Sequence, residues 1–456
     1  MQHQLKDQRG LHLAIGFAAT VAMWAVAYIA MMRPGQLAGE VLFGLMAIIL
    51  VLAARISGKL VEVPTSWACL RAGAKVGAFS AMANLLLIGS LIGGGEAGVL
   101  QQFALWSVGL FGASIGCGCL GGLWGSAGDR WHARVPATGL FGLTTAAAIF
   151  LLLVTGGLVT GLEAGLAVPD WPNSFGHNML LYPLAEMKDG VYYEHAHRLY
   201  GMLVGFCAIL MLVLTLMNEQ RGWVRALAVA GFLMVCVQGL MGGLRVTGNL
   251  TLSQDASELA PSVGLAVAHG VFGQIVFSLY CLLAVVCGAR WNSGMAPQQV
   301  AEAPSAALPT ALVAVLLVQL ITGALYRHLQ IPVAGAAPAY PTWAMHLHLT
   351  FAVVAFVATL WTGLRAMRMP ATLRPLRAVG HGLLMVVGLQ VLLGILALVM
   401  VITRKTEAIP LWEVVFTSLH QVTGAALLAT SMLLAAWWRR LTVPQVSSQG
   451  LPLAQA

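Results

Sequence analysis

The chain has 456 residues, of which 59% are hydrophobic and 9% are charged, whereas about 25% of the residues in an average soluble domain are charged. This composition excludes a soluble globular enzyme, a disordered regulator and a nucleic-acid-binding protein. The net charge is +8, from 24 basic and 16 acidic residues. In a membrane protein, an excess of basic residues indicates orientation, because Lys and Arg collect on the cytoplasmic side of spanning helices. The predicted class is an all-α polytopic membrane protein.

About twelve stretches of the chain are long and apolar enough to cross a membrane as helices, for which roughly 20 residues are needed. The second and ninth stretches are the shortest. In chain order, the twelve stretches are 11–32, 38–54, 74–92, 104–123, 137–157, 196–217, 225–244, 264–288, 310–326, 346–366, 378–402 and 414–438.

The charged residues alternate between the connections of these spans. Basic residues gather in connections such as 55–75 and 365–377, and acidic residues gather in connections such as 163–194. This bias predicts that both termini lie in the cytoplasm. The first apolar stretch is too long for the core of a signal peptide, and no small-residue cleavage site follows it. We therefore expect a multi-pass protein of a bacterial cytoplasmic (inner) membrane.

Four histidines in the last eight spans share one local pattern, in which a small residue follows the histidine by four positions. These histidines are His197, His269, His348 and His420, and the small residues are Gly201, Gly273, Ala352 and Gly424. The first two histidines are 72 residues apart, and so are the last two. All four lie near the start of spans that run inward, so we expect the imidazoles at one depth, toward the outer leaflet.

The apolar segments that precede these histidines also match each other. Residues 151–161 resemble 316–326, and 237–243 resemble 389–395. The pattern predicts two tandem four-helix bundles related by a pseudo-twofold axis along the membrane normal, because each copy has an even number of spans. The predicted domains are a four-helix N-terminal extension of unknown role (1–136), a first repeat (137–300) and a second repeat (301–456).

Histidines inside a membrane are functional candidates, because polar groups are costly there. Two histidines on facing helices supply both axial positions of a haem iron, and a small residue one turn later leaves room for the flat macrocycle. A zinc site needs a third or fourth ligand nearby, which the pattern does not supply. The alternative is four polar groups that form hydrogen bonds between helices. We expect two non-covalent haem sites, one in each repeat.

The two repeats differ by one acidic residue. Glu194 precedes His197 by three positions and shares its helix face, whereas Met345 holds the matching place in the second repeat. A carboxylate beside a haem accepts protons or stabilises a developing cation. The alternative role for Glu194 is that of a helix-start residue favoured by the macrodipole. The asymmetry predicts a substrate site in the first repeat and a cofactor site in the second.

Two arginines lie at the outer end of the first repeat, where haem propionates would emerge. Arg198 and Arg245 would each pair with a carboxylate, or would act as interfacial anchors.

Other histidines have no partner pattern. His195 and His346 each lie two residues before a proposed ligand, about 200° around the helix, so we expect them to point away from the site. His12 and His328 lie near the ends of spans, and we expect them to be solvated.

Five segments together resemble haem A synthase, the membrane enzyme of cytochrome oxidase assembly. They are GLVTGLEAGLAVPDWPNSFG (157–176), EHAHRLYG (194–201), QGLMGGLRV (238–246), AHGVFGQ (268–274) and LHQVTGA (419–425). The resemblance covers about 137–440, so the first four helices lie outside the usual eight-helix core. It implies an oxidoreductase that converts haem O to haem A, by oxidising one ring methyl group to a formyl group through successive hydroxylations.

The resemblance assigns the first repeat to the substrate haem and the second repeat to a haem b cofactor. The residues that bind the substrate haem would be His197, His269 and Arg198. Glu194 would be the catalytic group beside the methyl group. The axial ligands of the haem b iron would be His348 and His420. Because Leu349 stands where an arginine would match Arg198, His346 and His348 remain alternatives for one of these ligands.

Two other functions stay open. One is a dihaem b-type electron-transfer cytochrome, which keeps both haems and makes no product. The other is a transporter, for which paired repeats and the 51 glycines would also be expected. A synthase would have haem O as its substrate, membrane lipid around it, and a haem O synthase and an electron acceptor as candidate partners. We expect no nucleic-acid partner, and a homo-oligomer stays open.

Overall fold

The computed structural model describes residues 2–32, 38–63, 65–92, 99–127, 131, 135–248, 261–300 and 306–444. Twelve helices within these ranges are long and apolar enough to cross a membrane, which confirms the all-α polytopic class. The predicted domain boundary after residue 300 adjoins residues 301–305, which lie outside the described ones. The division into three domains therefore stays a prediction.

The helices follow the twelve apolar stretches but extend beyond most of them. They are α1 (Gln2–Met31), α2 (Gly39–Lys59), α3 (Ser66–Ile92), α4 (Val99–Ser126), α5 (Ala137–Gly161), α6 (Asp189–Asn218), α7 (Gly222–Thr247), α8 (Val263–Val286), α9 (Ala307–His328), α10 (Thr342–Met367), α11 (Arg374–Thr403) and α12 (Leu411–Leu441). The two stretches that were short in the sequence form full spans of 21 and 22 residues, because polar residues such as Lys59 and His328 continue the helix past the apolar run.

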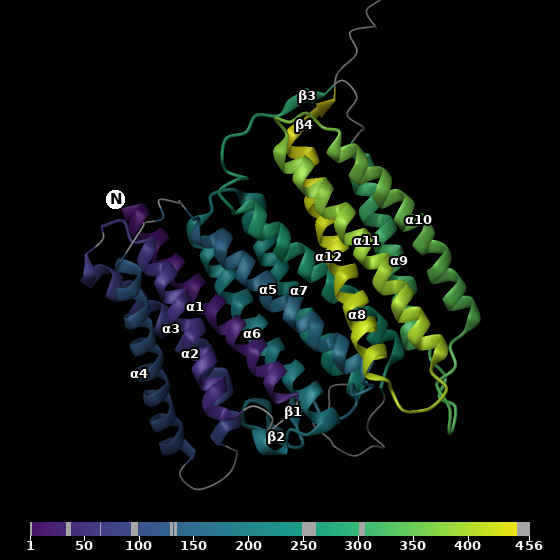
Figure 1. Ribbon diagram of the computed structural model, residues 1–456, viewed down its shortest axis with the longest axis horizontal. Helices are drawn as coiled ribbons and strands as arrows, with labels where there is room; N and C mark the ends of the chain where they lie inside the picture. Colours follow the sequence, from purple (N-terminus) through teal and green to yellow (C-terminus); the bar gives the residue numbers. More distant parts are fainter. Residues whose placement is uncertain are drawn as a thin grey trace, which may run out of the picture.

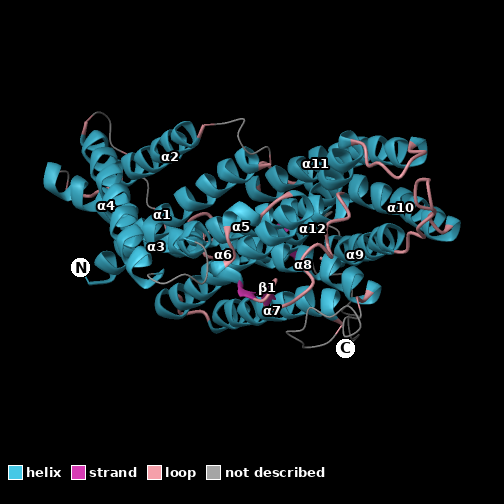
Figure 2. Cartoon of the chain, turned by 90° about the horizontal axis from the view of Figure 1, so that it is seen from below, coloured by secondary structure: helices cyan, strands magenta, loops and turns pink. Residues whose placement is uncertain are grey.

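The helices form three groups that follow the chain from one side of the molecule to the other (Figure 1). Helices α1–α4 form the extension. Helices α5–α8 form a closed ring in which each helix contacts the next and α5 contacts α8, and helices α9–α12 form a second ring in the same way. The rings meet through α5, α8, α9 and α12, which leaves α10 and α11 at the far side (Figure 2). The pseudo-twofold axis itself stays a prediction.

Two short strand pairs lie outside the spans. In the connection from α5 to α6, β1 (Asn173–Ser174) pairs with β2 (His177–Asn178), and two 3-10 turns, η1 (Met179–Leu181) and η2 (Leu184–Glu186), follow. At the other end of the bundle, β3 (Gln298–Val300) pairs in parallel with β4 (Thr442–Pro444). The segment between the two rings is therefore hydrogen-bonded to the segment that follows α12.

The extension is joined to the first ring mainly through α1. This helix packs along α5 and also contacts α6. The hydroxyl group of Tyr192 in α6 donates a hydrogen bond to the main-chain oxygen of Tyr28 at 2.7 Å, and Tyr200 donates one to Trp24. These bonds fix α6 against the extension.

His12 was expected to be solvated, and this expectation is wrong. The side chain is 5% exposed, and its Nδ1 atom lies 2.7 Å from Oγ of Ser57. The reason is that α2 continues to Lys59, which brings Ser57 into contact with α1.

Helices α3 and α4 approach so closely that the contact requires glycine. A Cβ atom at Gly73 would collide with the main-chain oxygen of Gly118, and a Cβ atom at Gly118 would collide with that of Gly73. Small residues allow membrane helices to pack backbone against backbone. Gly112, also in α4, has open space around it.

We expect Gly118→Val to lower the stability of the protein by roughly 1–3 kcal/mol, because the new side chain forces α3 and α4 apart. Gly112→Val is the matched control, since it makes the same change in the same helix without a neighbour, and should stay within about 0.5 kcal/mol. Thermal unfolding of the purified protein in detergent measures both. Equal midpoints for the two variants would show that α3 and α4 do not meet on this face.

Candidate functional site

Each of the four repeated histidines packs against a glycine of the preceding helix. The pairs are His197 with Gly156, His269 with Gly242, His348 with Gly323, and His420 with Gly394. A Cβ atom on any of these glycines would lie 2.8–2.9 Å from Cε1 of the ring, so any other residue would displace the imidazole. All four histidines lie about two turns from the first residue of their helices, which corresponds to roughly 9–14 Å along the helix axis.

His348 and His420 face each other inside the second ring. Their ring centres are 6.4 Å apart and their planes are inclined by 87°. Two imidazoles that bind one metal ion from opposite sides, through bonds of about 2 Å, have ring centres roughly 6 Å apart. No three His, Cys, Asp or Glu side chains of the described residues form a metal site. The pair therefore fits the axial positions of a haem, whose macrocycle supplies the other ligands.

His348, and not His346, is directed toward this site. Its Nδ1 atom lies 3.1 Å from Nε2 of Gln319 and 3.3 Å from Oγ1 of Thr322, and its ring stacks on Tyr326 at 6.3 Å. His346 is exposed, because two positions along a helix turn a side chain by about 200°. The geometry thus favours His348 of the two alternatives, and ligation itself stays a prediction.

His197 and His269 form the corresponding pair in the first ring. They lie close enough to interact electrostatically, and Nδ1 of His197 is 2.9 Å from Oγ1 of Thr155. His328, at the end of α9, also lies within electrostatic range of His269. We expected His328 to be solvated, but it is half-buried, because α9 packs against α8.

Glu194 is buried at 4% exposure and has fixed partners. Its Oε1 atom accepts a hydrogen bond from Nη2 of Arg198 at 2.7 Å, and its Oε2 atom accepts one from the main-chain N–H of Val168 at 3.0 Å. Charge-assisted hydrogen bonds of this kind are the strong ones. The carboxylate is therefore held in one orientation, one helical turn from His197.

The guanidinium group of Arg198 forms its hydrogen bonds with other groups of the same chain. Besides Glu194, its guanidinium group donates to the main-chain oxygens of Val168, Asp170 and Asn173 at 2.7–2.9 Å. It thus fixes the α5–α6 connection over the end of the first ring. The predicted role of Arg198 in binding a haem propionate stays a prediction, and these bonds would compete with it.

Arg245 has a different environment. Its guanidinium group has no hydrogen-bond or ion-pair partner among the described residues, and it packs against Gly165, where a Cβ atom would collide with it. Glu194 and Arg198 lie within electrostatic range. Arg245 is therefore the better placed of the two arginines to pair with a carboxylate from outside the chain.

The α5–α6 connection covers this end of the ring. Asp170 accepts hydrogen bonds from the main-chain N–H groups of Phe175 and Gly176 at 2.7 and 2.8 Å, and Trp171 packs directly on Gly243 of α7. His195 belongs to this layer rather than to the histidine pair, because its Nδ1 atom lies 3.0 Å from Oγ of Ser174.

Sequence reasoning missed three glutamines that contact the site histidines. Gln238, Gln319 and Gln390 each lie one turn before the glycine on which the ring packs. Their amide groups lie 3.5, 3.1 and 3.4 Å from a ring nitrogen of His269, His348 and His420, respectively. The signal was available, since the matched segments 237–243, 316–326 and 389–395 all contain Gln-x-x-x-Gly.

The small residue after two of the histidines faces these glutamines. A Cβ atom at Gly273 would lie 2.9 Å from Nε2 of Gln238, and one at Gly424 would lie 3.3 Å from Nε2 of Gln390. The space that these glycines leave, which we expected a macrocycle to use, is thus taken by a glutamine amide.

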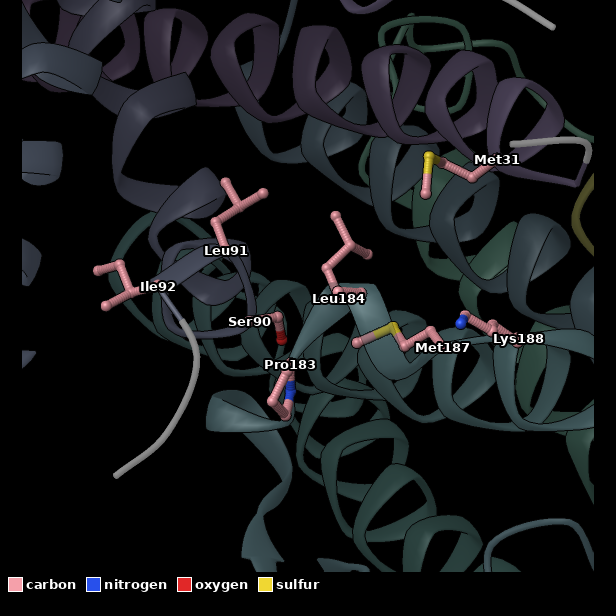
Figure 3. Close-up of a pocket in the computed structure, with 9 residues that line it drawn as sticks. Met31, Ser90, Leu91, Ile92, Pro183, Leu184, Met187 and Lys188 are labelled. Carbon is pink, nitrogen blue, oxygen red and sulfur yellow. The ribbon is translucent and has the colours of Figure 1, made fainter. Parts of the chain in front are cut away.

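An apolar cavity of about 530 Å³ lies elsewhere, between the extension and the α5–α6 connection (Figure 3). Met31 of α1, Leu91 of α3 and Leu184 contribute to its wall, with Lys188 at one side. None of the four histidines lines it, so it is separate from the candidate site.

Comparisons with known proteins agree with this arrangement of the chain. A family model described as cytochrome oxidase assembly protein matches residues 139–432, which takes in nearly all of the two rings and none of α1–α4. The chain is also similar to a protoheme IX farnesyltransferase of Haloarcula marismortui, with 29% identity over 142 residues, or 31% of this chain. That match spans only 28% of the relative's length. By the family match, which covers well over half of its length, the chain belongs to the haem A synthase family of cytochrome oxidase assembly proteins.

Proposed function

We propose that the first ring oxidises a ring methyl group of haem O to the formyl group of haem A, and that the second ring holds a haem b cofactor. The observation that carries this proposal is the position of Glu194. It is a buried carboxylate one turn from His197, and Met345 stands at the matching place beside His348. Among the described residues, the second ring therefore has no carboxylate at the place that corresponds to Glu194.

The residues of the first ring have separate roles in this proposal. His197 and His269 would hold the substrate haem from its two faces, and Arg245 would pair with a propionate. Glu194 would take up protons released as the methyl group is oxidised. Arg198 acts on Glu194, because it fixes one of the two carboxylate oxygens.

The residues of the second ring would hold a permanent cofactor. The 6.4 Å separation of the His348 and His420 ring centres supports axial ligation from both sides. When bound, haem b supplies reversible one-electron transfer. Conversion of the methyl group to a formyl group takes up an oxygen atom, from water or dioxygen, and removes electrons, so the proposed reaction also needs an oxygen source and an electron acceptor from outside the chain.

Pigment analysis tests the proposal against the dihaem cytochrome. We expect the protein, purified after co-expression with a haem O synthase, to contain haem A or haem O together with haem B. Haem B alone would contradict the proposal and support an electron-transfer cytochrome. A colourless protein would contradict both and support the transporter.

We expect Glu194→Gln to keep its haem but to accumulate unconverted haem O, with roughly 100-fold less haem A than the wild type, because the carboxylate acts in proton transfer. The amide keeps the size of the side chain and can still accept a hydrogen bond from Arg198. Extraction and chromatography of the pigments measure both haems.

Glu413→Gln is the control for this substitution. Glu413 is equally buried, at 4% exposure, and is paired with Arg404 at 3.2 Å, but it lies in the second ring. We expect the Glu413→Gln variant to produce nearly as much haem A as the wild type. Normal haem A output from Glu194→Gln would refute the role of Glu194.

We expect His348→Ala and His420→Ala to lose haem b, because each removes one axial bond to the iron. His346→Ala should keep it, since His346 is exposed. The absorption spectrum of the reduced protein and the extracted haem B measure the difference. Loss of haem b from His346→Ala alone would reverse the assignment between the two residues.

A further inference from the structure

The apolar cavity between the extension and the α5–α6 connection lies where three helices have their ends. Met31 is the last residue of α1, Ile92 is the last residue of α3, and Lys188 directly precedes α6. Because the ends of spanning helices lie at the edge of the hydrocarbon core, the cavity is at the level where lipid headgroups meet their acyl chains.

Both the extension and the connection contribute apolar side chains to the wall of this cavity. Met31 and Leu91 belong to the extension, and Leu184 and Met187 belong to the connection (Figure 3). Leu91 is 51% exposed, so protein atoms cover only about half of this apolar side chain. An occupant of the cavity therefore contacts both parts of the molecule at once.

Water is a poor occupant of this space. A buried water molecule needs two to four polar partners, and the side chains of the wall offer only the hydroxyl group of Ser90 and the amine of Lys188. The hydroxyl group of Ser90 already donates a hydrogen bond to the main-chain oxygen of Leu180 at 3.4 Å. An empty space would lose the dispersion contacts of its wall.

An apolar chain from the bilayer is the better occupant. The volume of about 530 Å³ lies within the range of sites that bind small molecules, about 300–1,000 Å³. An acyl chain that enters the cavity exchanges one apolar environment for another, and it restores the contacts that an empty cavity would lack.

The charged residues beside the cavity favour one kind of headgroup. Lys188 forms no ion pair within the described part of the chain, so its amine is free to bind a phosphate group. Glu186 and Asp189 lie on either side of it in the sequence, and both are exposed. Two acidic side chains around one basic side chain attract a headgroup that combines a phosphate with an amine, and they repel a headgroup with a net negative charge.

We propose that the cavity binds one acyl chain of a phosphatidylethanolamine molecule, whose phosphate pairs with Lys188 and whose amine faces Glu186 and Asp189. The lipid fills the space between the extension and the connection, and it stabilises the start of α6, the helix that carries Glu194. This binding site does not depend on the reaction proposed above.

Native mass spectrometry of the full-length protein tests this site. The purified protein is freed of lipid in detergent and titrated with phosphatidylethanolamine or with phosphatidylglycerol of the same acyl chains. We expect the first lipid to bind about fivefold more tightly, which is the effect of roughly one charge contact near a membrane surface.

Two substitutions remove different parts of the site. Leu184→Trp fills the cavity with an apolar side chain and should abolish the tightest binding of phosphatidylethanolamine. Lys188→Gln removes the contact with the phosphate and should weaken binding about fivefold. The matched controls are Leu105→Trp, at a position of α4 that is 72% exposed, and Lys405→Gln, in the exposed α11–α12 connection. Both controls should bind the lipid as the wild type does.

Thermal unfolding gives a second measurement, because a ligand that binds only the folded protein raises the midpoint. Phosphatidylethanolamine should raise the midpoint of the wild type and leave that of Leu184→Trp unchanged. Because Lys188 is exposed, Lys188→Gln keeps the test valid if Leu184→Trp does not fold.

Three results would overturn the proposal. The first is equal or tighter binding of phosphatidylglycerol by the wild type. The second is unchanged binding of phosphatidylethanolamine in both Leu184→Trp and Lys188→Gln. The third is a molecule other than a phospholipid that co-purifies with the wild type and is lost from Leu184→Trp.

Discussion

The contact between an imidazole ring and a glycine of the neighbouring helix determines how the eight-helix core is assembled. In each of the four hairpins, the ring lies where a Cβ atom would be 2.8–2.9 Å away, so only a glycine allows the two helices to keep their separation. Helices that lack a hydrophobic driving force between them associate through such close packing. The contact fixes the register between the two helices of each hairpin. This register places the histidines at similar distances from the helix ends, and it lets His348 and His420 face each other.

On this repeated scaffold, the proposed function depends on a few differences between the two rings. Glu194, with Arg198 and the α5–α6 connection, is present in one ring only. In the same ring, Leu152 stands one turn before Gly156, where the other three hairpins have glutamine. In spite of these differences, both rings have the same order of contacts between neighbouring helices. The two rings can therefore share one helix arrangement while they differ in the side chains beside their histidines.

The sequence predicted the spans and the four histidines well, because hydropathy and the 72-residue spacing are properties of the chain alone. It did not predict the ends of α2 and α9, where polar residues continue the helix, or the burial of His12, which depends on Ser57 of another helix. Gln319 and Gly323 were visible in a repeated segment, but their contact with His348 depends on the register between two helices. The hydrogen bonds from Arg198 to main-chain oxygens depend on how the α5–α6 connection folds back over the ring. The spacing of residues in the sequence does not determine that fold.

The hydrogen bonds from Tyr192 and Tyr200 to α1 link the four-helix extension to the first ring. Both phenols belong to the helix that also carries Glu194 and His197, and both hydroxyl groups are bonded to main-chain oxygens of the extension. Removal of residues 1–136 would leave two phenol groups directed at lipid without acceptors, at the helix on which the chemistry is proposed to occur. The extension therefore contributes to the packing of the helix that carries Glu194 and His197.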